Sequence, residues 1–167
     1  MLQRRAFLAS TLSPFAFSPL AVRAQGTPAE SEAAVRRALA QFLAAWNRHD
    51  FAAWSEMLAI DVHWVFPNSN SKRSRDVVAT YGSQRMRIYD VDFSVQRIKL
   101  HDNETRATLT LGGQERELPV RDGKYVRIWN RELLLTRWRL EDAQWRLYYW
   151  NDNTFESATL AKEEGLE

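Results

Sequence analysis

The spacing of apolar residues changes twice within residues 27–67, and these changes divide the segment into a long helix, a short helix and a strand. The long helix begins at Thr27, because Thr27 and Glu30 have the spacing of a capping box. Apolar residues then recur every three or four positions as far as Trp46, as they do along one face of a helix. Asp50 is placed to cap the second helix, after which apolar and polar residues alternate as in a strand.

A third short helix and four further strands are predicted in the rest of the chain. Residues 68–74 are polar and predict a mobile loop, and Ser74 is placed to cap a helix that Gly82 ends. Alternating apolar residues predict strands at 86–100, 105–111, 124–140 and 144–150, with turns at 102–103, 112–113 and 142–143. Residues 114–123 form either the end of a hairpin or a loop, and the polar residues 151–167 predict a loosely packed tail.

Residues 42–65, FLAAWNRHDFAAWSEMLAIDVHWV, resemble the opening of a known superfamily. An aromatic residue and two small residues precede the Trp46-Asn47 pair, Asp50 begins the second helix, and Asp61 lies at the entry to the strand. This arrangement is similar to the nuclear transport factor 2-like superfamily, and within it to the SnoaL-like and ketosteroid isomerase-like branch. The resemblance implies a cone-shaped α+β fold, in which about three N-terminal helices are packed in a curved, mainly antiparallel sheet. It also implies a pocket at the wide end of the cone.

The first 24 residues have the layout of an export signal. Arg4 and Arg5 precede a mildly apolar run, and small residues allow cleavage after Ala24. The RRxFL core resembles the twin-arginine signal, which directs folded proteins across the bacterial inner membrane, and Sec-dependent export stays an alternative. We therefore expect residues 1–24 to be removed, leaving a single domain, 25–167, in the periplasm or outside the cell.

The charge of the mature chain argues against nucleic acid as a partner. Three of the 23 basic residues belong to the signal, so 20 basic and 21 acidic side chains remain and no basic surface is indicated. The absence of cysteine excludes disulfides, a thiol nucleophile and iron–sulfur clusters. The three histidines are dispersed and lack the spacing of a metal site. We therefore expect no metal, no cofactor and no membrane span in the mature protein.

Ketosteroid isomerases carry their catalytic groups at positions that align with apolar residues here. The tyrosine that donates a hydrogen bond to the oxyanion aligns with Phe42, and the general-base aspartate aligns with Phe66. The later acid that shares the oxyanion site aligns near Thr136. A phenyl ring can neither donate a hydrogen bond nor accept a proton, so ketosteroid isomerase chemistry is not expected.

Other titratable residues keep a catalytic role open. Strand alternation turns Trp64 and Phe66 toward the inside of the cone, and therefore turns Asp61 and His63 toward the outside or the edge. Asp61, His63 and Tyr81 are the catalytic candidates, in a constellation that the sequence does not define.

Aromatic residues are concentrated at positions expected to line the cone. The predicted ligand-binding residues are Phe42, Trp46, Trp54, Trp64, Phe66, Tyr81, Thr136 and Trp138, with Tyr148 as a further wall residue. Apolar walls with few polar groups are typical of small-molecule sites, although the same side chains would also fill a core. The outer face of the sheet is expected to carry four more aromatic residues, which a homodimer would bury: Trp129, Trp145, Tyr149 and Trp150.

Two classes of function therefore remain. The first is non-catalytic binding of a small apolar or aromatic ligand, or of a partner, which the missing ketosteroid isomerase groups favour. The second is a cofactor-free lyase, isomerase or hydrolase of the SnoaL-like kind. An enzyme requires a titratable group with a shifted pKa that faces the cavity, whereas a binding protein requires only shape and an apolar wall.

Overall fold

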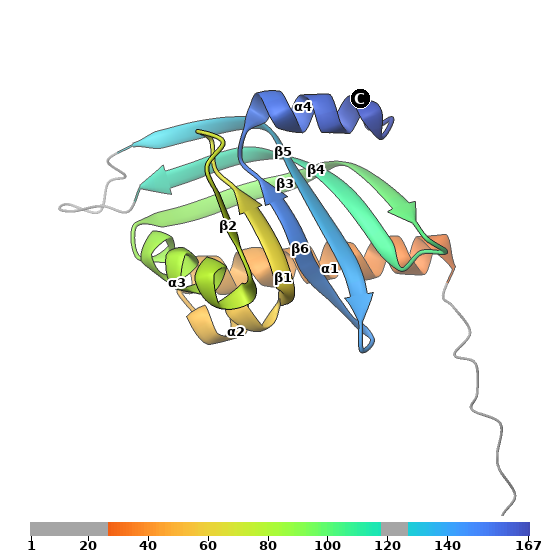
Figure 1. Cartoon of the computed structure of the whole chain (residues 1–167), viewed down its shortest axis with the longest axis horizontal. Helices are drawn as coiled ribbons and strands as arrows, with labels where there is room; N and C mark the ends of the chain where they lie inside the picture. Colours follow the sequence, from red (N-terminus) through yellow and green to blue (C-terminus); the bar gives the residue numbers. More distant parts are fainter. Residues whose placement is uncertain (1–26, 118–126) are drawn as a thin grey trace, which may run out of the picture.

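Four helices and a six-stranded sheet make up the described residues, 27–117 and 127–167, of the computed structural model (Figure 1). The predicted export signal lies outside these residues, as does the part of the predicted hairpin or loop from residue 118 onward. The helices are α1 Pro28–Asn47, α2 Phe51–Glu56, α3 Arg75–Met86 and α4 Thr154–Glu163. The strands are β1 Leu58–Val65, β2 Ser71–Arg73, β3 Tyr89–His101, β4 Arg106–Glu117, β5 Ile128–Glu141 and β6 Gln144–Asn151.

Helices α1 and α2 begin at their predicted caps. The Thr27 hydroxyl accepts a hydrogen bond from the Glu30 amide at 3.3 Å, while the Glu30 carboxylate accepts one from the Thr27 amide at 2.7 Å. The Asp50 carboxylate accepts a hydrogen bond from the Ala53 amide at 3.1 Å. Both caps use residues that are close in sequence, which is why the sequence alone predicts the two helix starts.

The sheet has the strand order β2-β1-β6-β5-β4-β3, so the first and last long strands of the chain are neighbours. Strand β1 is parallel to β6, and the other four strand pairs are antiparallel. Helix α1 crosses one face of this curved sheet and contacts β3 and β6 (Figure 1). The predicted α+β cone with a mainly antiparallel sheet is thereby confirmed.

The region between β1 and β3 differs from the prediction. Residues 71–73 of the expected loop form β2, which pairs with the end of β1. Helix α3 does not end at Gly82 but continues to Met86, and Ser74 precedes it without a side-chain hydrogen bond to the helix. A Cβ atom at Gly82 would lie 2.3 Å from Cη2 of Trp54. This glycine therefore permits close packing of α3 on the core and does not terminate the helix.

Strand β4 continues through Gly112-Gly113, where the sequence predicts a turn, and β5 has a bulge opposite these residues. Both glycines lie within β4, and a Cβ atom at Gly113 would lie 2.0 Å from a backbone oxygen of β3. Arg131 pairs with Gly113 and Leu134 pairs with Leu111, so two residues of β5 lie opposite one residue of β4. Because an extra residue reverses strand alternation, Arg131 and Leu134 both face the concave side of the sheet.

A second bulge, at Tyr148 of β6, corrects the predicted positions of several aromatic residues. Tyr148 does not line the cone, because its ring lies beside the guanidinium group of Arg139 on the outer face, at 5.4 Å. Trp145 and Trp150 face the core instead of the outer surface and are only 8% and 3% exposed. Tyr149 lies on the outer face, as expected.

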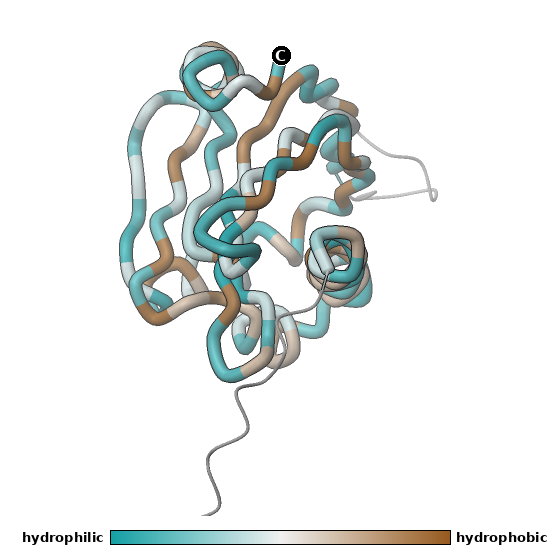
Figure 2. Tube along the Cα trace, turned by 90° about the vertical axis from the view of Figure 1, so that its right-hand side faces the viewer, coloured by the Kyte–Doolittle hydropathy of each residue, from teal (hydrophilic) through white to brown (hydrophobic). Residues whose placement is uncertain are grey.

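The C-terminal residues form a helix and not the loose tail that their polar composition predicts. Helix α4 is capped by Asn153, whose side chain accepts a hydrogen bond from the Glu156 amide at 3.1 Å. Its few apolar residues pack on the outer face of β5, where Leu135 contacts Ala161 and Leu166. Helices α1 and α4, both seen end on in Figure 2, therefore cover opposite faces of the sheet.

Aromatic residues fill the centre of the cone. The ring of Phe42 lies 5.4 Å from Trp54, 5.8 Å from Trp138 and 5.7 Å from Trp150. These four side chains are at most 3% exposed. The indole nitrogen of Trp138 donates a hydrogen bond to the Thr136 hydroxyl at 3.0 Å, so these two polar groups are also satisfied within the core.

Candidate active site

The eight predicted ligand-binding residues fall into two groups. Three of them lie in the closed core and line neither of the two spaces described below: Trp54, Thr136 and Trp138. The other five border these spaces, with Phe42, Trp46 and Trp64 around an inner cavity and Phe66 and Tyr81 along an outer groove. That these residues hold a ligand stays a prediction.

The inner cavity is small but lined by charged side chains. It has a volume of about 10 Å³, room for roughly one water molecule. Its charged lining residues are Arg85 from α3, Glu115 from β4 and Asp152 from the end of β6. Charged groups are seldom placed in the interior unless they are paired or functional, so this cluster marks the candidate site.

Asp152 is a carboxyl group buried at this cavity, with 9% of the residue exposed. The indole nitrogen of Trp64 donates a hydrogen bond to its Oδ2 at 3.1 Å, and the indole nitrogen of Trp150 donates one to its Oδ1. Burial raises the pKa of Asp152, while these two hydrogen bonds and the charges of Arg85 and Arg131 oppose the rise. The carboxyl group is therefore fixed in orientation and takes the protonated form more readily than an exposed aspartate.

Glu115 lies in the wall of the same cavity between two arginines. Its side chain is 8% exposed, and its Oε2 accepts a hydrogen bond from Nη2 of Arg131 at 3.0 Å, while its Oε1 accepts one from Nη2 of Arg85. The guanidinium carbon of Arg85 also lies 4.8 Å from the ring centre of Tyr89. Trp129, expected on the outer face, packs edge-on against Tyr89 at 5.4 Å. The bulge in β5 brings Arg131 to this group.

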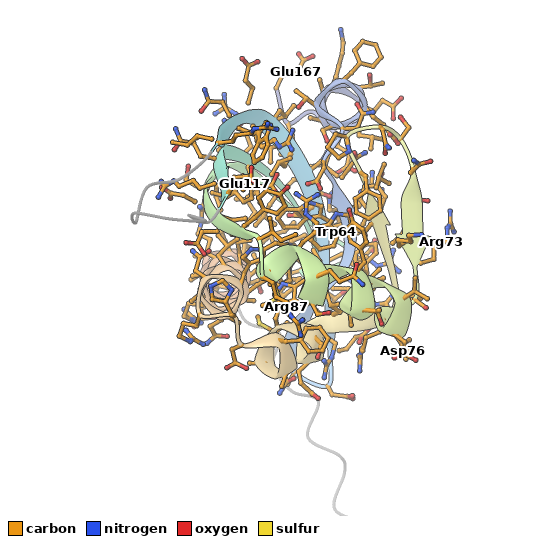
Figure 3. The ribbon with its side chains drawn as sticks, turned by 90° about the vertical axis from the view of Figure 1, so that its left-hand side faces the viewer. Trp64, Arg73, Asp76, Arg87, Glu117 and Glu167 are labelled. Atoms are coloured by element: carbon orange, nitrogen blue, oxygen red, sulfur yellow. The ribbon has the colours of Figure 1, made fainter. Side chains whose placement is uncertain are left out.

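The outer groove opens between the β1–β2 hairpin and α3. It has a volume of about 680 Å³, and its walls include Phe66, Lys72, Tyr81 and Arg85. The rings of Phe66 and Tyr81 are 4.5 Å apart. Figure 3 looks onto this end of the molecule, where Trp64 lies in the interior beside α3. Because Arg85 borders both spaces, its side chain lies between the groove and the inner cavity.

Of the three predicted catalytic candidates, only Tyr81 borders the groove. Asp61 faces the outer side and accepts hydrogen bonds from Arg139 Nη1 at 3.0 Å and Nη2 at 2.5 Å, which lower the pKa of Asp61. His63 packs edge-on against Tyr149 at 5.5 Å, and burial lowers its pKa. Strand alternation predicts this outward placement correctly, and the structure does not bring Asp61 and His63 together with Tyr81.

Sequence reasoning missed the charged residues of the candidate site. Arg85 follows Gly82, the expected end of the helix, and Arg131 faces inward only because of the bulge in β5. Asp152 belongs to a segment that reads as a polar tail. One signal in the sequence pointed to Asp152. It lies two residues after Trp150, at the end of an apolar strand, where a side chain lies at the edge of the core.

Within residues 27–117 and 127–167, no cluster of three or more histidine, cysteine or acidic residues has the arrangement of a metal site. None of the helices in these ranges combines the length and apolar character needed to cross a bilayer. The predicted dimer surface is partly covered, because α4 packs over β5 on that face.

Comparison with known proteins agrees with the observed fold. Residues 39–148 match the family model described as SnoaL-like domain. No curated protein matches the chain. Among solved structures, a proposed dehydratase of the nuclear transport factor 2-like family from Streptomyces avermitilis is 18% identical, with a TM-score of 0.63 over 75% of this chain and 96% of that chain.

Two further solved structures have similar folds. A proposed scytalone dehydratase from Novosphingobium aromaticivorans is 11% identical, with a TM-score of 0.65 over 74% of this chain and 83% of that chain. A ketosteroid isomerase-like protein from Erwinia carotovora atroseptica is 16% identical, with a TM-score of 0.59 over 73% of this chain and 94% of that chain. At these identities the similarity establishes the fold and not the activity.

Proposed function

We propose that this chain, which belongs to the SnoaL-like domain family, is an acid–base enzyme that acts on a small apolar or aromatic molecule without a cofactor. The supporting observation is the buried Asp152 carboxyl group in the wall of the inner cavity, which the side chain of Arg85 separates from the outer groove. A titratable group with a raised pKa that faces a cavity is typical of an enzyme. The proposed reaction is that of a lyase or isomerase, in which a proton moves to or from a carbon next to a carbonyl group.

In this proposal Asp152 transfers the proton. Its protonated form donates a proton and its ionised form accepts one. A raised pKa brings the populations of the two forms closer to equal near neutral pH. Trp64 and Trp150 hold the carboxyl group in place through their N–H groups. The substrate enters from the outer groove and reaches Asp152 when Arg85 turns aside, a side-chain rotation of the kind that commonly accompanies binding.

The exchange of carbon-bound protons tests this proposal even while the substrate is unidentified. The protein is incubated in D₂O with a panel of small aryl ketones and unsaturated carbonyl compounds, and deuterium uptake next to the carbonyl is followed by NMR. We expect accelerated exchange for at least one compound. The Asp152→Asn variant should lose the acceleration, because a side-chain amide cannot act as a general base or acid toward the carbon-bound proton.

The matched control is Asp142→Asn, an identical chemical change in the exposed turn between β5 and β6. It should exchange protons like the wild type. Exchange that persists in a folded Asp152→Asn protein would overturn the assignment of Asp152.

Non-catalytic ligand binding is the second candidate function. Two observations favour binding over catalysis by Asp152. Both carboxyl oxygens of Asp152 already accept indole hydrogen bonds, and the inner cavity beside them is only about 10 Å³ in volume. In addition, Phe42 and Phe66 occupy the positions that align with the catalytic tyrosine and aspartate of ketosteroid isomerases, and a phenyl ring cannot transfer a proton. If aromatic compounds bind and none exchanges protons in the presence of the protein, this second function replaces the first.

The export and dimer predictions are part of the same proposal. We expect the protein in the bacterial periplasm with Gln25 as its first residue, and replacement of Arg4 and Arg5 by lysine should block export only along the twin-arginine route. The intact mass of the exported protein tests the cleavage. A native mass spectrum of the same sample reports whether the chain forms the proposed homodimer and whether a small ligand stays bound.

A further inference from the structure

The described residues around the candidate site carry more positive than negative charge. Arg85 and Arg131 share one buried anion, Glu115. Asp152 adds one further negative charge when it is ionised. Lys72 adds a positive charge in the wall of the outer groove. Excess positive charge in a partly buried site attracts an anion, because the surrounding low-dielectric walls weaken screening by water.

Arg85 is placed to bind such an anion. It borders both the inner cavity and the outer groove, and its side chain is 18% exposed. Glu115 would not be left unpaired if Arg85 turned away, because Arg131 also donates a hydrogen bond to it at 3.0 Å. A guanidinium group is suited to this exchange of partners, since its planar donors match a carboxylate in a two-point contact.

The rest of the groove is suited to a flat apolar molecule. The rings of Phe66 and Tyr81 lie 4.5 Å apart along its wall, close to Arg85 and Lys72. Aromatic walls beside cationic groups fit a ligand that combines an apolar body with one charged end.

We propose that the molecule bound at the mouth of the cone is a small aromatic or unsaturated acid, and that Arg85 leaves Glu115 to bind its carboxylate. The inference rests on the proposed function for the location of the site and adds the substrate class. It assigns Arg85 as the residue that determines specificity, whereas Asp152 remains the residue that transfers the proton.

Paired ligands test the proposal in the wild-type protein. Benzoate, phenylacetate and trans-cinnamate are compared by isothermal titration calorimetry with their uncharged amides, at low salt and pH 7. We expect at least one acid to bind about tenfold more tightly than its amide, the size of effect that a hydrogen-bonded charge pair gives. The preference should decrease as salt is added. Equal affinity for every acid and its amide would overturn the inference.

Variants then locate the charge that is responsible. Arg85→Gln should reduce the preference for the acid to about twofold or less, and Arg85→Lys should retain part of it. Arg36→Gln is the matched control, because Arg36 pairs with Glu32 on the exposed surface of α1 and should leave the preference unchanged. If Arg85→Gln does not fold, Lys72→Gln provides the test on an exposed residue of β2, with an expected loss of about threefold in affinity for the acid.

The Asp152→Asn variant separates this inference from the proposed function. It should keep the preference for acids while losing proton exchange. Acid binding through Arg85 without any proton exchange in the wild type would leave the inference standing and remove the proposed function. Proton exchange that depends on Asp152, combined with equal binding of acids and amides, would support the proposed function and overturn the inference about Arg85.

Discussion

The indole nitrogen of Trp64 donates a hydrogen bond to Oδ2 of Asp152 at 3.1 Å, across 88 positions of the chain. The bond joins β1 to the residue that follows β6, and the Trp150 indole donates to the other carboxyl oxygen. The stacked rings of the two tryptophans, 4.7 Å apart, keep both donors in place. The position of the carboxyl group is thus determined by core packing and not by a flexible loop.

Replacing Trp64 with phenylalanine should raise the pKa of Asp152 further, because the ionised form loses a hydrogen-bond donor while burial is kept. The free energy of unfolding should fall by about 2 kcal/mol, from the lost hydrogen bond and the smaller ring. A ¹³C NMR titration of the Asp152 carboxyl group and urea unfolding measure the two effects. Trp129→Phe is the control, since it shortens another partly buried indole outside this interaction and should leave the titration unchanged.

The pH dependence of stability should report the raised pKa of Asp152. Between the ordinary aspartate pKa, about 4, and the raised value, the folded protein binds more protons than the unfolded chain, so this residue lowers stability as pH rises. Asp152→Asn removes that contribution. The Tm of the Asp152→Asn protein relative to the wild type should therefore increase as pH rises from about 4 through the raised pKa of Asp152, whatever constant offset the amide introduces. Asp142→Asn should give a curve parallel to that of the wild type, and a parallel curve for Asp152→Asn would contradict the burial effect.

Gly82→Ala should destabilise the protein although it lies inside α3, where alanine normally favours a helix by about 1 kcal/mol. The added Cβ would lie 2.3 Å from the ring of Trp54, which is fully buried and cannot move freely. We expect a net loss of about 1–3 kcal/mol in urea unfolding. Gln84→Ala, two residues further along on the exposed side of α3, should change stability by only a few tenths of a kcal/mol. A stabilised Gly82→Ala protein would show that α3 packs differently.

Asn153→Ala should weaken α4, because the Asn153 side chain accepts a hydrogen bond from the Glu156 amide at the helix start. The expected cost is about 1 kcal/mol, seen as a lower free energy of unfolding and faster hydrogen exchange in α4. Thr159→Ala, on the exposed surface of the same helix, should be neutral or slightly stabilising because alanine has the higher helix propensity. Unchanged exchange in the Asn153→Ala protein would argue against this cap.

Local patterns predict most of the fold. The capping box of Thr27 and Glu30 and the cap at Asp50 act through neighbouring residues, so their effect is readable in the sequence. The prediction that Gly82 ends a helix is wrong because the role of this glycine depends on Trp54, which lies far from it in the sequence. A glycine at a helix end and a glycine under a large ring look the same in a sequence.

The candidate site is less predictable than the fold, because its charged residues depend on sheet irregularities. Arg131 reaches Glu115 only after the bulge in β5 has reversed the alternation, and a similar bulge at Tyr148 turns Trp150 inward toward Asp152. A bulge depends on the pairing of two strands, so neither strand alone reveals it. The aromatic positions Trp64 and Phe66 precede these irregularities, and alternation assigns both to the correct face.

The parallel pairing of β1 with β6 also constrains the order of folding. Among the six described strands, β1 pairs with β2 and β6, and β6 comes after the other five in the chain. Until residues 144–151 have been synthesised, the helices with β1 and the β3–β5 meander have no strand to connect them. We therefore expect cooperative folding to occur only after β6 has been synthesised, and relatively slowly, since the paired residues of β1 and β6 are more than 80 positions apart. Fragments that end before β6 should expose two unpaired strand edges and aggregate.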